Sequence, residues 1–256
     1  MIDTPTEFHI SHVTDVPWCP GCGSHMLQKA VNLALHELKI EQENLLMVSE
    51  IDQAIKLSDT KLVVIVESGE RNMLGEGGHH FLRAIRRNTD VTMIVHNNMA
   101  YGLTNAQASP ASQHGRKTPA KLEPFNPLGV ALSRNAPFIA RAFAGDIEQT
   151  KLMIMEAITF KGFSVVDVCQ PCVLFNKLSA YHWFKKNISY LPKGHNTTDR
   201  NAAFRLATGY DKLPLGVFFR HNGSALYEEP LGIDTTPLFQ QQHDERNCKM
   251  MIEACR

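Results

Sequence analysis

The sequence predicts an α/β protein with a mostly parallel sheet flanked by helices. Two runs rich in β-branched residues, 61–67 and 91–96, lack polar–apolar alternation, which is the pattern of strands buried on both faces. A helical pattern lies between them at residues 81–87, and another precedes them at residues 25–38. Strands that alternate with helices in this way favour parallel pairing, with helices covering both sides of the sheet.

The first half of the chain supplies the elements in order. Apolar side chains recur at helical spacing through residues 25–38, in one row that begins at Met26 and a second that begins at Leu27. Residues 45–49 are predicted to form a short strand before the first buried run. The helix predicted at residues 81–87 ends in basic side chains, which suit a helix C-terminus.

Later elements complete the predicted sheet. Residues 138–143 and 163–168 are predicted to be strands, and Asp146 with Gln149 has the spacing of a capping box for a helix that runs to about residue 160. Beyond about residue 175 the periodicity weakens. We therefore expect an α/β core over residues 1–175 and a C-terminal extension over residues 176–256 that packs on it.

Composition and charge exclude several classes of function. The 26 basic and 26 acidic residues give a formal net charge of zero, which offers no reason to expect nucleic acid as a partner. No run approaches the ~18 apolar residues of a membrane span. The first residues lack the basic and apolar regions of a secretory signal, so a cytoplasmic location is expected.

Four of the six cysteines form two C-x-x-C pairs, Cys19 with Cys22 and Cys169 with Cys172. In a reducing compartment such pairs are more often metal ligands or redox thiols than structural bridges. The Pro-Gly between the first two can hold both sulfurs on one side of a tight turn, which suits a metal or an iron–sulfur cluster. A redox dithiol and a purely structural turn stay open, as does a zinc site built from both pairs. Cys169 alone also suits the role of a small buried apolar side chain.

Two polar segments follow the buried strands, where parallel sheets bind ligands. After the first come Gly69, Glu70 and the glycine-rich residues 75–78, whose backbone N–H groups can cradle a diphosphate. The alternative is that these glycines bind nothing, because turns from a strand into a helix often need glycine for steric reasons alone. After the second strand, Asn97 and Asn98 offer neutral oxygens that suit Mg²⁺, although adjacent asparagines also favour turns.

In order and spacing these segments resemble the β subunit of 2-oxoacid:ferredoxin oxidoreductases, a thiamine-diphosphate-binding family. The resemblance extends from about residue 18 to residue 219. Its most specific part is GEGGHHFLRAIRRN at residues 75–88, followed by NN at 97–98 and YGLT at 101–104. The resemblance implies the thiamine-diphosphate-binding fold of that family.

The resemblance also implies metal ligands. Cys19, Cys22 and Cys172 match ligands of the family's [4Fe–4S] cluster, and Gln53 stands where the family has the remaining cysteine. The segment at residues 51–61 is shorter than in the family, which has a His-Gly-Arg stretch there.

For the organic cofactor, Gly69 and Glu70 occupy the start of the family's Gly-Asp-Gly motif, whose Asp binds Mg²⁺, and Arg71 replaces its second glycine. Asn98 and the carbonyl of Ala100 match the other two Mg²⁺ ligands. Two further positions match backbone contacts to the diphosphate: Gly102 and Leu103.

The implied activity is oxidative decarboxylation of a 2-oxoacid, such as pyruvate or 2-oxoglutarate, to an acyl-CoA. Coenzyme A takes up the acyl group, and electrons pass through iron–sulfur centres to ferredoxin. The glutamate that activates the thiamine would lie on a partner α subunit, so no catalytic residue is assigned in this chain. Two alternatives stay open: a non-catalytic relative kept for assembly or regulation, which Arg71, Gln53 and the short segment favour, and a zinc-stabilised binding protein.

Overall fold

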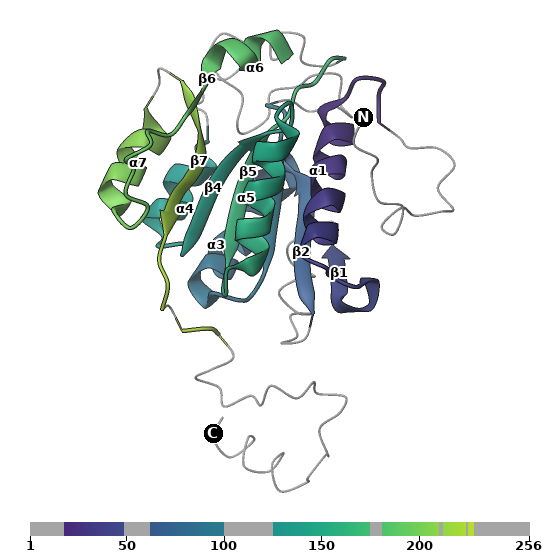
Figure 1. The fold of residues 1–256 in the computed structure, drawn as a ribbon. Helices are drawn as coiled ribbons and strands as arrows, with labels where there is room; N and C mark the ends of the chain where they lie inside the picture. Colours follow the sequence, from purple (N-terminus) through teal and green to yellow (C-terminus); the bar gives the residue numbers. More distant parts are fainter. Residues whose placement is uncertain are drawn as a thin grey trace, which may run out of the picture.

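The structure is a computed structural model, and it describes residues 18–48, 62–99, 125–174, 181–209, 212–223 and 225–227. Figure 1 shows these residues as a sheet with helices on both sides. In chain order the elements are α1 (Gly23–Glu37), the 3₁₀ helix η2 (Gln42–Asn44), β1 (Leu45–Val48), β2 (Val63–Gly69), the π-helix η3 (Arg71–Glu76), α3 (Gly78–Arg87), β3 (Thr92–Asn97), α4 (Pro127–Ser133), β4 (Phe138–Phe143), α5 (Ile147–Thr159), β5 (Ser164–Cys169), α6 (Tyr181–Asn187), β6 (Ile188–Tyr190), α7 (Arg200–Thr208) and β7 (Leu213–Arg220).

The described strands form one seven-stranded sheet in the order β1-β2-β3-β5-β4-β7-β6. The first five strands of that order pair in parallel, whereas β7 runs antiparallel to β4. This confirms the predicted mostly parallel sheet. Because their directions agree, β2, β3, β5 and β4 all end at one edge, which we call the carboxyl edge.

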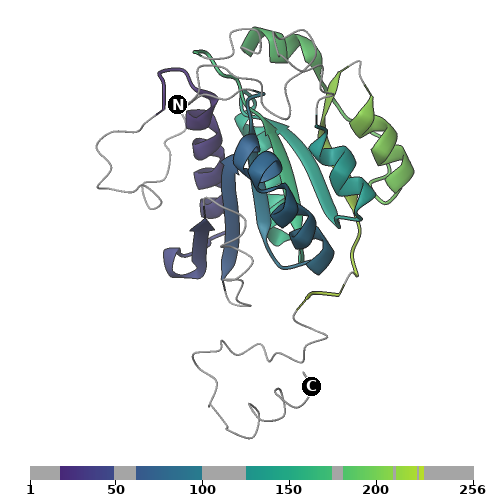
Figure 2. The same cartoon turned by 180° about the vertical axis from the view of Figure 1, so that it is seen from behind.

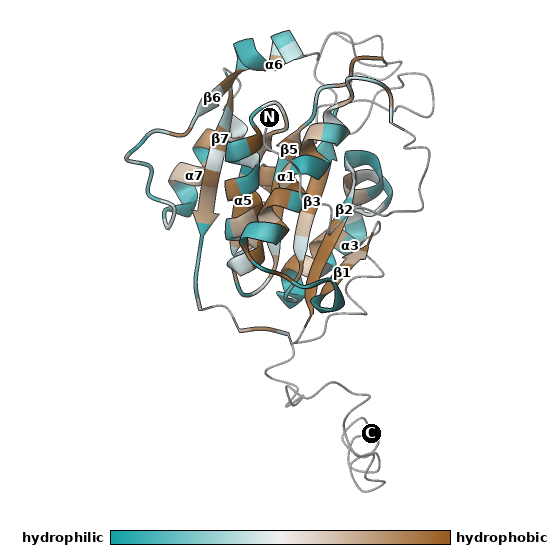
Figure 3. Ribbon diagram, turned by 45° about the vertical axis from the view of Figure 1, so that its right-hand side comes forward, coloured by the Kyte–Doolittle hydropathy of each residue, from teal (hydrophilic) through white to brown (hydrophobic). Residues whose placement is uncertain are grey.

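Helices cover both faces of the sheet, as Figures 1 and 2 show from opposite sides. On one face, α1 and α5 pack against Ile65, Ile94 and Val166. On the other, α3, α4 and α7 pack against a core that includes Val64 and Val95. We call these the α1/α5 face and the α3/α4 face. Successive residues of a strand alternate between the two cores, which explains why the buried runs show no polar–apolar alternation. Figure 3 shows the strands largely brown and α6 mainly teal.

The elements predicted over residues 25–168 agree with the structure to within a few residues at their ends, and the strand at 138–143 coincides with β4. The expected cap of α5 is half confirmed. The Asp146 carboxylate accepts a hydrogen bond from the Gln149 N–H at 3.1 Å. However, the Gln149 side chain does not complete the capping box, because it accepts from the Phe143 N–H and donates to the Arg141 carbonyl. That glutamine therefore ties α5 to β4 instead.

After residue 175 the described chain holds α6, β6, α7 and β7, none of which the sequence patterns predicted. The last of these strands lies beside β4 in the sheet. A domain boundary near residue 175 stays a prediction, although strands on both sides of it share the sheet. Among the described helices, none is both long and apolar enough to cross a membrane.

Candidate functional site at the carboxyl edge

Three predicted site segments leave the sheet at its carboxyl edge. β2 ends at Gly69, which pairs with His96 of β3, and the next residue of β3, Asn97, pairs with Cys169 at the end of β5. The parallel register therefore places the residues that follow these strands, Glu70 among them, along one edge. This is where open α/β sheets bind their ligands.

Glu70 follows β2 directly and precedes η3. Its side chain is buried, with 2% of the residue exposed. The next residue, Arg71, lies nearer the solvent, and its Nε and Nη2 are 3.1 and 3.0 Å from Oε1 of Glu76. The carboxylate at the family's aspartate position is thus enclosed by protein, while the arginine at the second glycine position pairs along the surface of η3.

The glycines beside this carboxylate are of two kinds. A Cβ built on Gly69 or Gly78 would meet none of the described residues within 4 Å, so both glycines border open space there. A Cβ on Gly77 would lie 2.2 Å from the carbonyl oxygen of Asn72, so that glycine is required by the turn from η3 into α3. The open space at Gly69, at the end of β2, is one that a side chain would fill, and we call it the cradle.

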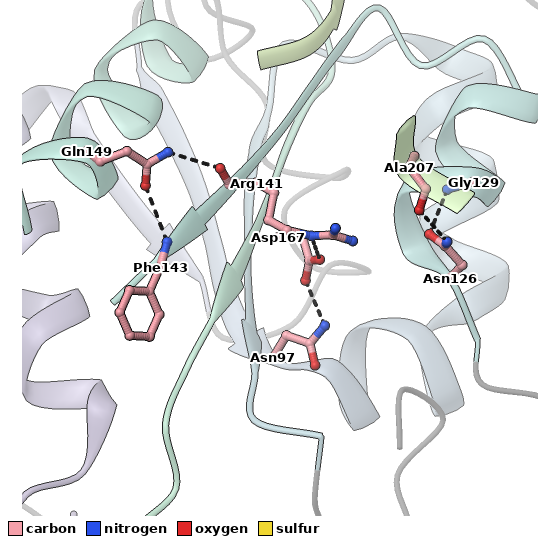
Figure 4. A network of polar contacts seen from close by, with 8 residues as sticks. All are labelled: Asn97, Asn126, Gly129, Arg141, Phe143, Gln149, Asp167 and Ala207. Atoms are coloured by element: carbon pink, nitrogen blue, oxygen red, sulfur yellow. Dashed lines mark hydrogen bonds and ion pairs between the residues drawn. The ribbon is translucent and has the colours of Figure 1, made fainter. Parts of the chain in front are cut away.

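A buried polar network joins the ends of β3, β5 and β4 on the α3/α4 face (Figure 4). Arg141 and Asp167 are opposite each other in the sheet, and Nε of the arginine donates to Oδ2 of the carboxylate at 2.9 Å. The other carboxylate oxygen accepts from Nδ2 of Asn97 at 2.8 Å. The sequence analysis did not predict this network, although a signal was present. Arg141 and Asp167 are each the one charged residue of a largely apolar strand.

Asn98, which follows β3, is partly buried at the same edge. It is the one predicted Mg²⁺ ligand from this segment that can be placed. Four other positions that the resemblance to the family identified lie outside the described residues: Gln53, Ala100, Gly102 and Leu103. The short segment at residues 51–61 lies outside them as well.

The Cys19–Cys22 turn lies at the same edge, at the start of α1. The Cys22 N–H donates to the Cys19 carbonyl at 3.0 Å and closes the turn, and the Gly23 N–H donates to the Pro171 carbonyl at 3.1 Å. This second bond joins the turn to the segment that carries Cys172. The three predicted cluster cysteines therefore lie on two segments that the fold brings into contact.

Gln170 fills the junction between those segments. Its amide Nε2 donates to Oγ of Ser24 at 2.8 Å and lies 3.7 Å from Sγ of Cys22. Sγ of that cysteine is also 3.3 Å from the serine hydroxyl. In this arrangement the Cys22 thiol donates to the serine hydroxyl, and the Gln170 amide donates toward the sulfur.

Cys169 belongs to a different environment. Its side chain packs in a small apolar cluster with Met99, Phe143 and Phe184. Burial, followed by the nearby Asp167 carboxylate, raises the pKa of the Cys169 thiol to about 12. The thiol is therefore held neutral, as expected for a small buried apolar side chain.

No three His, Cys, Asp or Glu side chains gather closely enough to hold a metal ion within the described parts of the chain. The two C-x-x-C pairs are thus neighbours without forming a four-cysteine zinc site. The same finding applies to Cys19, Cys22 and Cys172, which do not assemble a metal site among the described residues.

A cavity of about 500 Å³ lies elsewhere at this edge, where the start of α5 approaches α1, α6 and β6. Lys29, Asp146 and Tyr190 are among the residues that line it, and none of its lining residues is a predicted site residue. The Tyr190 hydroxyl bonds to the Asp146 carboxylate, and this bond, followed by burial, raises the pKa of the tyrosine. The mixed charge of the lining specifies no ligand, and the chemistry instead concentrates at the ends of β2 and β3.

Comparison with known proteins adds to this geometry. Residues 52–168 match the family "Thiamine pyrophosphate enzyme, C-terminal TPP binding domain", and residues 172–233 match the family of C-terminal regions of the pyruvate ferredoxin oxidoreductase beta subunit. The 2-oxoacid:ferredoxin oxidoreductase subunit beta of a Sulfolobus species is 32% identical over 92% of this chain and 94% of its own length. The corresponding subunit of Saccharolobus solfataricus is 31% identical over 83% of this chain and 84% of its own.

A solved structure is similar over nearly the whole chain. It is the 2-oxoglutarate:ferredoxin oxidoreductase from Magnetococcus marinus with 2-oxoglutarate, coenzyme A and succinyl-CoA bound. It matches with a TM-score of 0.83 and 26% identity, covering 93% of each chain.

Proposed function

Because this chain belongs to the family of 2-oxoacid:ferredoxin oxidoreductase β subunits, we propose that it binds thiamine diphosphate and Mg²⁺ at the carboxyl edge. The bound cofactor serves the oxidative decarboxylation of a 2-oxoacid to an acyl-CoA. The observation that carries this proposal is the enclosed carboxylate of Glu70 beside open space at Gly69, at the end of a strand whose neighbour leads into Asn98.

The residues at this edge fit the group chemically. Mg²⁺ prefers carboxylate and carbonyl oxygens and takes its remaining ligands from phosphate and water. Glu70, Asn98 and the carbonyl of Ala100 are assigned to the cation. The diphosphate is assigned to the backbone at three positions: Gly69, Gly102 and Leu103. The glutamate carboxylate keeps the negative charge of the family's aspartate with one more methylene.

The arginine at position 71 is compatible with an open cradle. Its guanidinium pairs with Glu76 on the surface of η3, while Gly69 and Gly78 border the open space. When bound, thiamine diphosphate supplies the carbon nucleophile that decarboxylation requires. The residues of this chain bind and orient it, and none of them is assigned as the general base.

The partners follow from the family. A β subunit implies an α subunit, which is expected to carry the glutamate that activates the thiamine. A 2-oxoacid, coenzyme A and ferredoxin are proposed as the other reactants. The relative of known structure has 2-oxoglutarate, coenzyme A and succinyl-CoA bound, which favours this class of substrate. The cytoplasm is the proposed location.

Cys19, Cys22 and Cys172 are proposed as ligands of an iron–sulfur cluster. The contact between Gly23 and Pro171, which joins their two segments, supports this assignment. Iron and sulfide analysis of anaerobically purified protein tests it. Zinc without sulfide would contradict the cluster and favour a structural metal.

Calorimetric titration of the full chain, purified with its α subunit, tests the cofactor site. We expect thiamine diphosphate to bind in the presence of Mg²⁺ and not after chelation of the cation. Glu70→Gln should weaken binding at least about tenfold, because the carboxylate charge toward the cation is lost. Glu148→Gln is the matched control, since that carboxylate is 59% exposed and pairs with Lys151 on α5, away from the cradle. A wild type that does not bind, or two variants that bind alike, would overturn the assignment.

A further inference from the structure

Figure 4 contains three side-chain amides, and they differ in how their two ends are used. Gln149 accepts from the Phe143 N–H at 3.3 Å and donates to the Arg141 carbonyl at 3.1 Å. Asn126 also uses both ends, because it accepts from the Gly129 N–H at 3.0 Å and donates to the Ala207 carbonyl at 2.8 Å.

Asn97 is different, because only its nitrogen has a partner. Nδ2 donates to Asp167, whereas Oδ1 is buried and meets no hydrogen-bond donor among the described residues. The residue is 4% exposed, so bulk water does not reach this oxygen freely. A buried acceptor without a donor is costly, and native structures keep few of them.

The orientation of this amide is fixed by its neighbours. A carboxylate only accepts hydrogen bonds, so the nitrogen of Asn97 must face Asp167 and the oxygen must face away from it. The carboxylate cannot turn to suit the opposite arrangement, because its second oxygen is held by Nε of Arg141 at 2.9 Å. The ion pair is buried, with side-chain exposures of 6% and 1%. The network therefore holds one carbonyl oxygen in a set direction at the end of β3.

The position of Oδ1 in the fold indicates what kind of group can donate a hydrogen bond to it. Asn97 is the last residue of β3 and directly precedes Asn98, and it leaves the sheet beside the strand that leads into Glu70. A diphosphate at this edge offers only acceptors and cannot satisfy a carbonyl oxygen. A hydrated Mg²⁺ can, because it usually keeps several waters, each of which donates hydrogen bonds.

We propose that Oδ1 of Asn97 accepts a hydrogen bond from a water bound to the Mg²⁺ of the cofactor. Asp167 and Arg141 act as positioning residues that hold this oxygen toward the cation. The proposal rests on the cofactor site proposed above. It gives Asn97, whose side-chain oxygen the sequence analysis had noted as suited to Mg²⁺, a role through water, and it adds Asp167 and Arg141, which no sequence motif indicated.

The test compares Asn97→Leu with Asn126→Leu in the full chain with its α subunit. Both variants replace an amide with an apolar side chain of similar size, and both should lower the melting temperature. We expect Asn97→Leu to raise the Mg²⁺ concentration needed for half-maximal thiamine diphosphate binding by about tenfold, the loss expected for one hydrogen bond. Asn126→Leu should change it by less than about twofold, because both ends of that amide bond within the protein.

The outcomes separate this proposal from the one it rests on. A wild type that binds no thiamine diphosphate with Mg²⁺ overturns both. If the wild type binds it and the two leucine variants need the same Mg²⁺ concentration, only the role of Asn97 is overturned. Should Asn97→Leu fail to fold, a crystal structure of the wild type with thiamine diphosphate and Mn²⁺ decides. A Mn²⁺-bound water within hydrogen-bond distance of Oδ1 supports the proposal, and any other partner there refutes it.

Discussion

The two faces of the sheet meet at the carboxyl edge with different chemistry. On the α3/α4 face, Asn97 and the Arg141–Asp167 ion pair present oxygen and nitrogen atoms. On the α1/α5 side, Gln170 contacts Ser24 and the sulfur of Cys22. A backbone bond joins the two groups, since the Gln170 N–H donates to the Asn97 carbonyl at 2.9 Å. The end of β3 therefore presents oxygen atoms suited to a hard cation, whereas the start of α1 presents a sulfur suited to a soft one.

The buried amides of the two groups are alike. Gln170, like Asn97, commits its nitrogen to partners in the protein, and its Oε1 is buried without a donor among the described residues. The two places differ in the glycines nearby. Gly69 borders open space, whereas a Cβ on Gly23 would lie 2.6 Å from Cγ of Gln170. The end of β2 therefore leaves space for a ligand, and the cysteine turn is closed by protein.

The largest effect should follow from breaking the ion pair of the α3/α4 face. Asp167→Ala leaves the Arg141 guanidinium buried without its partner and removes the acceptor of Asn97. We expect a loss of about 3–5 kcal/mol in the free energy of unfolding, measured by urea denaturation. Glu156→Ala is the matched control, since Glu156 lies 3.7 Å from Arg220 with both side chains about 40% exposed. That variant should lose less than about 1 kcal/mol, and similar losses for the two would show that the buried network contributes little.

The next largest effect should come from the difference between Gly23 and Gly69. Gly23→Ala places a methyl group 3.0 Å from Pro171 as well as against Gln170, so we expect a loss of about 1–3 kcal/mol in unfolding free energy. Gly69→Ala meets none of the described residues within 4 Å and should change stability by less than about 0.5 kcal/mol. Its cost should appear in calorimetry as about tenfold weaker binding of thiamine diphosphate. A stability loss from Gly69→Ala with unchanged binding would remove the distinction between the end of β2 and the cysteine turn.

Much of the sheet was predictable, because it depends on local pattern. Runs without alternation identified β2 and β3, and Asp146 identified the start of α5. The elements after residue 175 were not predictable in the same way. β6 has only three residues, and β7 pairs antiparallel with β4 through an irregularity at Ile139 and Ala140. Such an edge depends on tertiary contacts that no short window of sequence contains.

The residues of the site were likewise predictable only where a local sequence motif identified them. Motif residues such as Glu70 and Asn98 could be found from their order in the chain. The Arg141–Asp167–Asn97 network could not, because it depends on the register between β3, β5 and β4, whose partners are 26 and 70 residues apart. Single charges inside apolar strands were the available signal. They show that something is buried and paired, but the partner is known only once the strand order is known.

The smallest effect concerns Cys169, which tests whether every cysteine near this edge belongs with the Cys19–Cys22 turn. Its thiol pKa of about 12 means that the folded protein keeps it protonated where the unfolded chain ionises it. The unfolded state then binds fewer protons, so stability should fall as the pH rises above the ordinary thiol range. Unfolding measured at about pH 8 and about pH 10 should show a larger loss for the wild type than for Cys169→Ala. Iodoacetamide at about pH 8 should modify Cys19 and Cys22 in metal-free protein and spare Cys169, since the first two are partly exposed whereas Cys169 is buried and stays protonated. Equal labelling of all three would place Cys169 with the turn after all.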